Sequence, residues 1–185
     1  GLEIARSLFS LSPENAEVRM ELRRLAILED QVPALKDLYI GTLEQKSDLR
    51  RTLAWEVALL EEEELHDKGE AEKYYRMVLE EEPLHEAAFA ALERLTTEAE
   101  RWTDLRSLIE ARVEVLHDAD EQKAMLLKLS SLNENILADI DAAILAYRQL
   151  RQLDAGSQDA FIALQRLYDL AENWAELADL YQDEL

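Results

Sequence analysis

Two stretches of this chain repeat one another: ERWTDLRSLIE at Glu100–Glu110 and ENWAELADLYQ at Glu172–Gln182. Each begins with a glutamate, has a tryptophan two positions later and a leucine three positions after that. The similarity extends upstream, because residues 69–113 align with residues 141–185 without a gap and share fourteen identical positions. A weaker copy, RRLAILEDQVPALKDLY, occupies residues 23–39. The chain is therefore about two and a half copies of one unit, which is typical of repeat proteins.

Within each unit the apolar residues follow helical spacing, as in the series Phe89, Leu92, Leu95 and Ala99. The chain has only 4 Gly and 3 Pro among 185 residues, and short polar breaks separate the periodic segments. The pattern predicts helices at residues 2–10, 15–28, 32–46, 48–66, 69–81, 85–98, 102–117, 120–137, 140–153, 158–171 and 174–185. Tight turns are expected at Glu100-Arg101 and Glu172-Asn173.

The spacing of these residues also points to a family. Ala71 and Tyr75 lie four apart, Pro83 follows eight residues later, and Phe89 and Leu92 come next. The same spacing recurs at Ala143, Tyr147, Phe161, Leu164, Leu177 and Tyr181. This skeleton resembles the tetratricopeptide repeat (TPR) and half-a-TPR-like helical repeat family, in a degenerate form. Glu93 and Gln165 stand where the family has a glycine, and Leu35, Leu105 and Leu177 where it has an alanine.

The resemblance implies an all-α fold, an α-α superhelix built as a TPR-like solenoid of helical hairpins. We expect one array over residues 1–185, with repeat units at about 1–46, 47–117 and 118–185. Aromatic and leucine side chains at helical spacing are expected to pack between the helices, with ligand contact as the alternative for the tryptophans. These packing positions are Trp55, Tyr75, Phe89, Leu92, Trp102, Leu105, Tyr147, Phe161, Leu164, Trp174 and Leu177.

Composition narrows the range of partners. The 41 acidic side chains outnumber the 20 basic ones and give a net charge of −21, which repels nucleic acid and anionic membrane surfaces unless a basic patch compensates. There is no cysteine, which excludes disulfides and thiolate metal sites. No apolar run approaches the ~18 residues of a membrane span. We expect no nucleic-acid partner and no membrane insertion, and a soluble, cytoplasmic protein by default.

Catalytic patterns are weak. The three histidines lie near no serine or cysteine pattern for nucleophilic catalysis, and there is no glycine-rich phosphate loop. The best metal constellation is Glu62 with His66, joined by Glu70, which falls short of a usual zinc site. The acidic runs Glu61–Glu64 and Glu80–Glu82 are expected to form solvated faces. The sequence therefore predicts a non-enzyme without metal or cofactor.

The TPR resemblance implies a concave groove lined by the first helix of each hairpin. The residues expected to contact a partner there are Met20, Arg24, Ile27, Ala90, Arg94, Glu98, Ile162, Arg166 and Asp169. Arg24, Arg94 and Arg166 occupy one slot of three successive units and could hold an acidic peptide or a carboxylate. The alternative is pairing within the chain, Arg94 with Glu98 and Arg166 with Asp169.

The favoured function is a protein-interaction scaffold that binds a partner peptide or protein segment in this groove. The chain starts at Gly1 without a methionine, and apolar helices stand at both ends. We expect a part of a longer array, because solenoids need capping helices. The alternatives are a structural module that self-associates end to end, or a regulatory arm of a larger multidomain protein.

Overall fold

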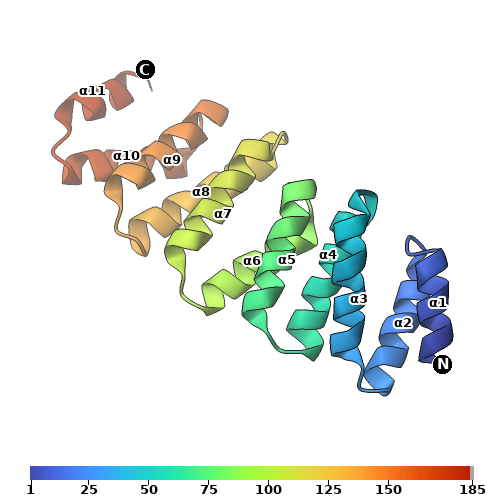
Figure 1. The fold of residues 1–185 in the computed structure, drawn as a ribbon. Coiled ribbons are helices and arrows are strands. Elements are labelled where there is room, and N and C mark those ends of the chain that lie inside the picture. The colour runs from blue at the N-terminus through green and yellow to red at the C-terminus, as the bar shows by residue number, and fades with distance from the viewer. Residues whose placement is uncertain (184–185) are drawn as a thin grey trace. The chain divides into compact units, whose positions relative to one another are not determined.

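The computed structural model describes residues 1–183, and every regular element in that range is helical (Figure 1). The elements are α1 (Leu2–Leu11), α2 (Ala16–Leu28), α3 (Val32–Gln45), η1 (Ser47–Leu49), α4 (Arg50–Leu59), η2 (Leu60–Glu64), α5 (Lys68–Glu81), α6 (Glu86–Glu98), α7 (Trp102–Val115), α8 (Ala119–Asn135), α9 (Ile140–Leu153), α10 (Gln158–Leu170) and α11 (Trp174–Gln182). The all-α helical repeat fold is thereby confirmed.

The predicted helices agree with the observed ones to within two residues at their ends, with one clear exception. The single helix expected over 48–66 is divided into η1, α4 and η2, and η2 is a π-helical turn. A π turn holds one more residue than an α turn, which allows Glu61 and Glu62 both to face the protein interior. The last two residues of the helix predicted over 174–185 lie outside the described residues.

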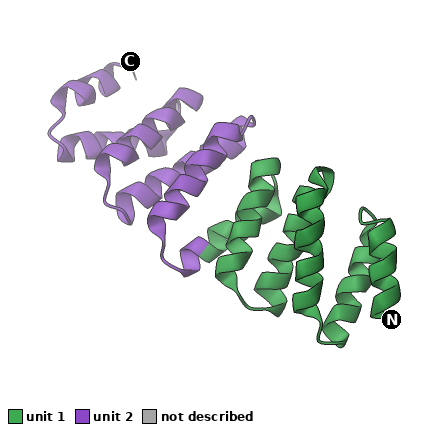
Figure 2. Cartoon of the chain, in the orientation of Figure 1, with its two compact units in different colours: residues 1–95 green, residues 96–185 purple. Residues whose placement is uncertain are grey.

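The chain divides into two compact units, residues 1–95 and residues 96–185 (Figure 2). In unit 1, α1 packs on α2, α3 on α4, and α4 on α5. In unit 2, α7 packs on α8, α8 on α9, α9 on α10, and α10 on α11. Each unit is thus a run of antiparallel neighbours. The repeat units expected from the sequence stay a prediction.

The turns within the hairpins recur with the sequence period. Asp30, Glu100 and Glu172 have φ values of 55°, 54° and 53°, in the left-handed region. In each case the next residue donates its backbone N–H to a carbonyl five positions back, at 2.7–3.0 Å, which closes a Schellman motif. His66 and Ala138, 72 residues apart, form a second pair of left-handed turns. The tight turns expected at Glu100 and Glu172 are confirmed.

The helix starts that follow the longer breaks are capped by side chains at equivalent positions. Asn15 accepts the backbone N–H groups of Glu17 and Val18, and Ser157 accepts that of Ala160. At the equivalent position of α6, His85 Nδ1 accepts the Ala88 N–H at 3.1 Å. These caps satisfy amide groups that a helix start leaves without partners.

Most of the expected packing positions lie in the core. Tyr75, Phe89, Leu92, Leu105, Tyr147 and Leu164 are buried, whereas Trp55, Trp102, Phe161 and Leu177 are partly buried. Trp55 contacts two rings, Tyr75 and His85, with centroid distances of 5.5 and 5.0 Å. Trp174 differs from the expectation, because 58% of its surface is exposed. It is the first residue of α11, and no described element covers that side of the helix.

We predict that Ala138→Gly stabilises the protein. A left-handed conformation costs an alanine about 1–2 kcal/mol, whereas glycine loses about 0.5–1 kcal/mol through the entropy of the unfolded chain. The expected gain in the free energy of unfolding is about 0.5–1 kcal/mol in urea titrations. Ala124→Gly, at an exposed position inside α8, serves as the control and should lower stability by about 1 kcal/mol. A loss of stability in both variants would contradict the prediction.

Candidate functional site

A carboxylate within the η2 turn, that of Glu62, links three helical segments of unit 1. Glu62 Oε2 accepts a hydrogen bond from the Tyr75 hydroxyl at 2.8 Å. The other oxygen of Glu62 forms an ion pair with Arg94 on α6. The Glu62 side chain is 16% exposed and that of Arg94 is 45% exposed. We call this arrangement of Glu62, Tyr75 and Arg94 the Glu62 bridge.

The same arrangement recurs 72 residues later in unit 2. Glu134, at the end of α8, accepts a hydrogen bond from the Tyr147 hydroxyl on α9 at 3.2 Å. Its other oxygen forms an ion pair with Arg166 on α10. The Glu134 side chain is only 8% exposed, although 59% of the Arg166 side chain remains accessible. Glu134, Tyr147 and Arg166 form the Glu134 bridge.

These bridges change the interpretation of the arginine row, by which we mean Arg24, Arg94 and Arg166 at one position of three successive units. Arg166 pairs with Glu134 on a neighbouring helix rather than with Asp169 on its own helix. Arg24 pairs with Glu21 at 2.7 Å, and this hydrogen bond lowers the pKa of the Glu21 carboxyl. Each arginine of the row therefore already contacts a carboxylate of its own chain. A partner carboxylate would have to share the arginine with that internal partner.

The acidic run Glu61–Glu64 is not the solvated face that the sequence suggested. Glu61 is buried, and Lys36 on α3 lies 3.0 Å from its carboxylate, which raises the pKa of the lysine through this hydrogen bond. Glu63 and Glu64 both pair with Arg23 on α2, at 2.6 and 3.2 Å. Basic side chains from α2, α3 and α6 thus form ion pairs with this acidic run.

The three residues of the candidate metal site, Glu62, His66 and Glu70, do not form a set of metal ligands. Glu62 belongs to the Glu62 bridge, His66 forms a left-handed turn, and Glu70 pairs with Lys73. Among the described residues, no group of three or more His, Asp or Glu side chains has an arrangement that could hold a metal ion. Nor does any described helix have the length and apolar character to cross a membrane.

The apolar side chains expected to face a partner are accessible. Met20 is 69% exposed, Ile27 42% and Ile162 57%. Leu28 and Leu170, on the same helices, are also exposed. The remaining members of the expected set, Ala90, Arg94, Glu98, Arg166 and Asp169, are exposed as well. The structure thus brings an exposed apolar and charged face together on α2 in unit 1, and another on α10 in unit 2.

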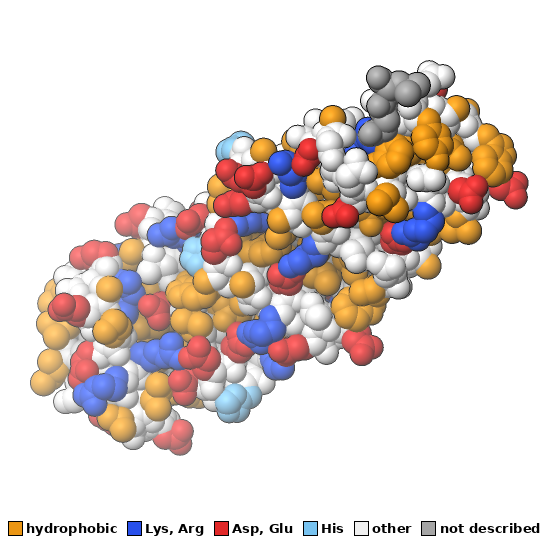
Figure 3. Space-filling view, turned by 180° about the vertical axis from the view of Figure 1, so that it is seen from behind, with side chains coloured by type: hydrophobic (Ala, Val, Ile, Leu, Met, Phe, Trp, Pro, Cys, Tyr) orange, Lys and Arg blue, Asp and Glu red, His pale blue; other side chains and the backbone are white. Residues whose placement is uncertain are grey.

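Figure 3 shows how apolar and charged side chains are distributed on one face of the molecule. Acidic and basic side chains lie close together over most of this face, with hydrophobic side chains between them. Hydrophobic side chains also reach the surface over the C-terminal helices, where Trp174 and Tyr181 are exposed. Because charges of both signs alternate, the surface shown offers no broad basic patch for a polyanion.

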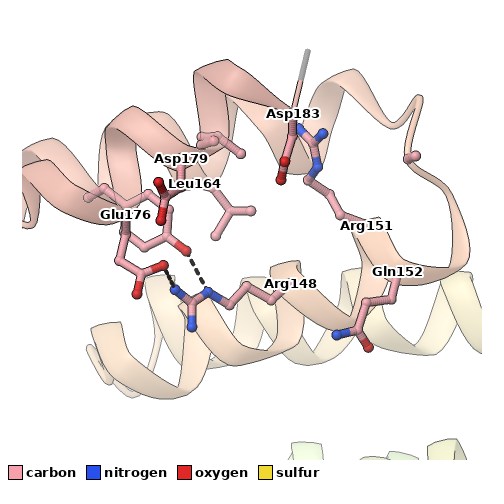
Figure 4. A pocket seen from close by; sticks show the side chains of 10 residues that line it. Arg148, Arg151, Gln152, Leu164, Glu176, Asp179 and Asp183 are labelled. Atoms are coloured by element: carbon pink, nitrogen blue, oxygen red, sulfur yellow. Dashed lines mark hydrogen bonds and ion pairs between the residues drawn. The ribbon is translucent and has the colours of Figure 1, made fainter. Parts of the chain in front are cut away.

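A pocket of about 530 Å³ lies between α9, α10 and α11 (Figure 4). Arg148 donates from Nε to the Tyr168 hydroxyl at 2.6 Å and forms an ion pair with Glu176. The hydrogen bond to Tyr168 raises the pKa of the Arg148 guanidinium above its ordinary value. Asp179 and Asp183 line the same pocket. Arg148 is one of the fourteen identical positions of the repeat, where it matches Arg76, but the sequence gives no sign of the pocket.

No protein-family model and no curated protein matches this chain. Among solved structures, the chain is similar to YrrB, described as a TPR protein with an unusual peptide-binding site, at 16% identity over 99% of this chain and 91% of YrrB, with a TM-score of 0.46. A tetratricopeptide repeat protein from Parabacteroides merdae ATCC 43184 gives 15% identity, coverage of 98% and 70%, and a TM-score of 0.47. MamA gives 11% identity, coverage of 85% and 89%, and a TM-score of 0.45. At such low identities and TM-scores, these likenesses carry no conclusion about function.

We predict that Glu134 and Arg166 are energetically coupled. A double-mutant cycle with Glu134→Gln and Arg166→Gln should give a coupling of about 0.5–2 kcal/mol in the free energy of unfolding, because the carboxylate is nearly buried. The matched control is the exposed pair Glu21 and Arg24, for which we expect about 0.3–0.5 kcal/mol or less. If the effects of the two single substitutions at 134 and 166 simply add, the bridge is not a stabilising unit.

We also predict a tyrosine-dependent loss of stability at alkaline pH. Burial, followed by the hydrogen bond to Glu62, raises the pKa of Tyr75 well above the ordinary value of about 10. Because the pKa is raised in the folded state, the stabilising contribution is complete below pH ~10 and is lost as the pH rises above it, by up to about 1.4 kcal/mol per pH unit. Tyr75→Phe should reduce this slope in urea titrations above pH ~10. Equal slopes in both proteins would refute the prediction.

Proposed function

We propose that the chain is a non-catalytic protein-interaction scaffold that binds a segment of a partner protein on the first helices of its hairpins. The observation that carries the proposal is the exposure of apolar side chains between fixed charges at equivalent positions of α2 and α10. Met20, Ile27 and Leu28 lie around Arg24 on α2, and Ile162 and Leu170 lie around Arg166 on α10.

The chemistry of this face suits a peptide segment. Exposed apolar side chains supply area that becomes buried on binding, and the flanking charges fix the orientation of the bound chain. Arg24 pairs only with the exposed Glu21 of its own helix, whereas Arg166 is held by the nearly buried Glu134, so that the position of Arg166 is largely set before a partner arrives. Such preorganisation lowers the entropy cost of binding.

An acidic partner segment remains part of this proposal. The Arg24 and Arg166 side chains are 58% and 59% exposed, so a partner carboxylate can approach the same guanidinium that the chain already uses. Arginine has five N–H donors and can serve two carboxylates together. Charge reversal of these arginines would be a poor test, because it would place a second carboxylate beside Glu134 or Glu21.

The test is a paired affinity capture with quantitative mass spectrometry. The binding variant carries Met20→Glu, Ile27→Glu, Ile162→Glu and Leu170→Glu, at exposed positions where the fold should tolerate the change. The control variant carries Leu84→Glu and Leu153→Glu, which are exposed elsewhere. We expect one protein to be retained by the wild type and the control and lost by the binding variant. Calorimetry with the purified partner should then show a loss of affinity of about tenfold or more.

Two checks decide the outcome. Circular dichroism melts must show that all three proteins are equally folded, and sedimentation velocity must show whether the chain self-associates. If the wild type and the binding variant retain the same proteins, the proposed face is not the binding site. If the wild type instead forms larger species as its concentration rises, self-assembly becomes the better function.

A further inference from the structure

A groove between second helices recurs in the two units. In unit 1, Ile40, Leu43 and Glu44 of α3 face Tyr74 and Met77 of α5 around a pocket of about 390 Å³. In unit 2, the equivalent residues Glu110, Val113 and Glu114 of α7 face Ala146 and Gln149 of α9 around a pocket of about 280 Å³. These grooves are formed by other helices than those of the proposed function, so the inference below does not depend on it.

The two units differ at one equivalent buried polar position. In unit 1 the buried carboxylate of Glu61 has an ion-pair partner, the Lys36 ammonium, at 3.0 Å. In unit 2 the position of Glu61 is taken by Asn133, which lines the pocket and is only 1% exposed. Its Oδ1 accepts no hydrogen bond from the described residues. The counterpart of Lys36 is Arg106, which instead reaches Asp139 at 2.9 Å.

A buried acceptor without a donor is rare and costly in a folded protein. A hydrogen-bond donor that enters the pocket beside Asn133 would satisfy this acceptor. At the equivalent position in unit 1, Glu61 has such a donor from the chain itself, the ammonium group of Lys36.

The rim of the pocket carries negative charge that the protein does not neutralise. Glu110 and Glu114 are exposed and lie one helical turn apart on α7, where like charges repel one another. Neither carboxylate has a hydrogen bond or ion pair with the described part of the chain. Between rim and floor, the walls are apolar, with Val113, Leu129 and Leu145 as lining residues. Leu145 is 59% exposed and stands at the entrance.

We propose that the pocket between α7 and α9 binds a lysine side chain of a partner protein. The ammonium group donates to Asn133 Oδ1, the methylene stem packs against Val113 and Leu145, and Glu110 and Glu114 neutralise the charge. At about 280 Å³ the pocket is below the usual ~300–1,000 Å³ of small-molecule sites, which suits a single side chain. The net charge of −21 attracts a basic partner to this surface.

Solution NMR with n-butylammonium chloride tests the proposal, because this ion is the lysine side chain without its backbone. We expect saturable shifts of the Asn133 side-chain amide and of the Val113 and Leu145 amides, with a dissociation constant of about 1–10 mM. n-Butanol has the same stem without the charge, and at equal concentration and ionic strength it should leave the Asn133 signals unchanged.

Four variants locate the effect. Asn133→Leu should weaken binding about tenfold or more and should leave the protein folded, because it removes a buried polar group that has no partner. Glu110→Gln with Glu114→Gln should weaken binding severalfold. Asn133→Asp should strengthen binding, since it places a carboxylate where unit 1 has Glu61. Glu44→Gln, at the matching position in unit 1, should have no effect.

The results that support the lysine pocket differ from those that overturn it. A response at Asn133 that needs the ammonium group and weakens in both the Asn133→Leu protein and the double glutamate variant supports the lysine pocket. The proposal is overturned if Asn133 does not respond, if n-butanol produces the same shifts, or if Asn133→Leu binds n-butylammonium as well as the wild type does.

Discussion

A largely buried glutamate at the end of a first helix is the contact on which the repeat depends. Glu62 in unit 1 and Glu134 in unit 2 each accept a hydrogen bond from a tyrosine hydroxyl on the second helix of the same hairpin. Each also forms an ion pair with an arginine on the first helix of the next hairpin. One carboxylate thereby connects three consecutive helices. A charge at so low an exposure is tolerated because both of its oxygens have partners.

This contact also explains how so acidic a chain folds. With 20 basic side chains against 41 acidic ones, self-repulsion favours the unfolded state unless the bases are placed where they offset most charge. Lys36 and Arg23 contact glutamates of the η2 turn, and Arg94 and Arg166 close the two bridges. Arg94 and Arg166, which join neighbouring helices, are also positive groups of the first-helix faces. Acidic groups remain in excess elsewhere, as at Glu110 and Glu114.

Much of the fold follows from the sequence because hydrophobic spacing and short breaks are local signals. The helix ends were predicted to within about a turn, and the tight turns at Glu100 and Glu172 followed from the repeat. The arginine row was visible for the same reason. Its internal partners are not a local signal, since Glu134 and Arg166 are 32 residues apart. The 72-residue repeat also continues upstream of residue 69, where it matches Leu60 with Leu132, Glu62 with Glu134 and Asp67 with Asp139, and so includes the glutamates of both bridges. The exposure of Trp174 and the open acceptor of Asn133 depend on what packs beside them, and local patterns do not encode this.

Hydrogen exchange on Glu134→Gln is the most direct measurement of the central claim, that the buried glutamate couples consecutive helices. If Glu134 holds α9 and α10 to the end of α8, the substitution should accelerate amide exchange in both of those helices and leave the middle of α7 unchanged. Faster exchange restricted to the residues beside position 134, with α9 and α10 protected as in the wild type, would contradict it.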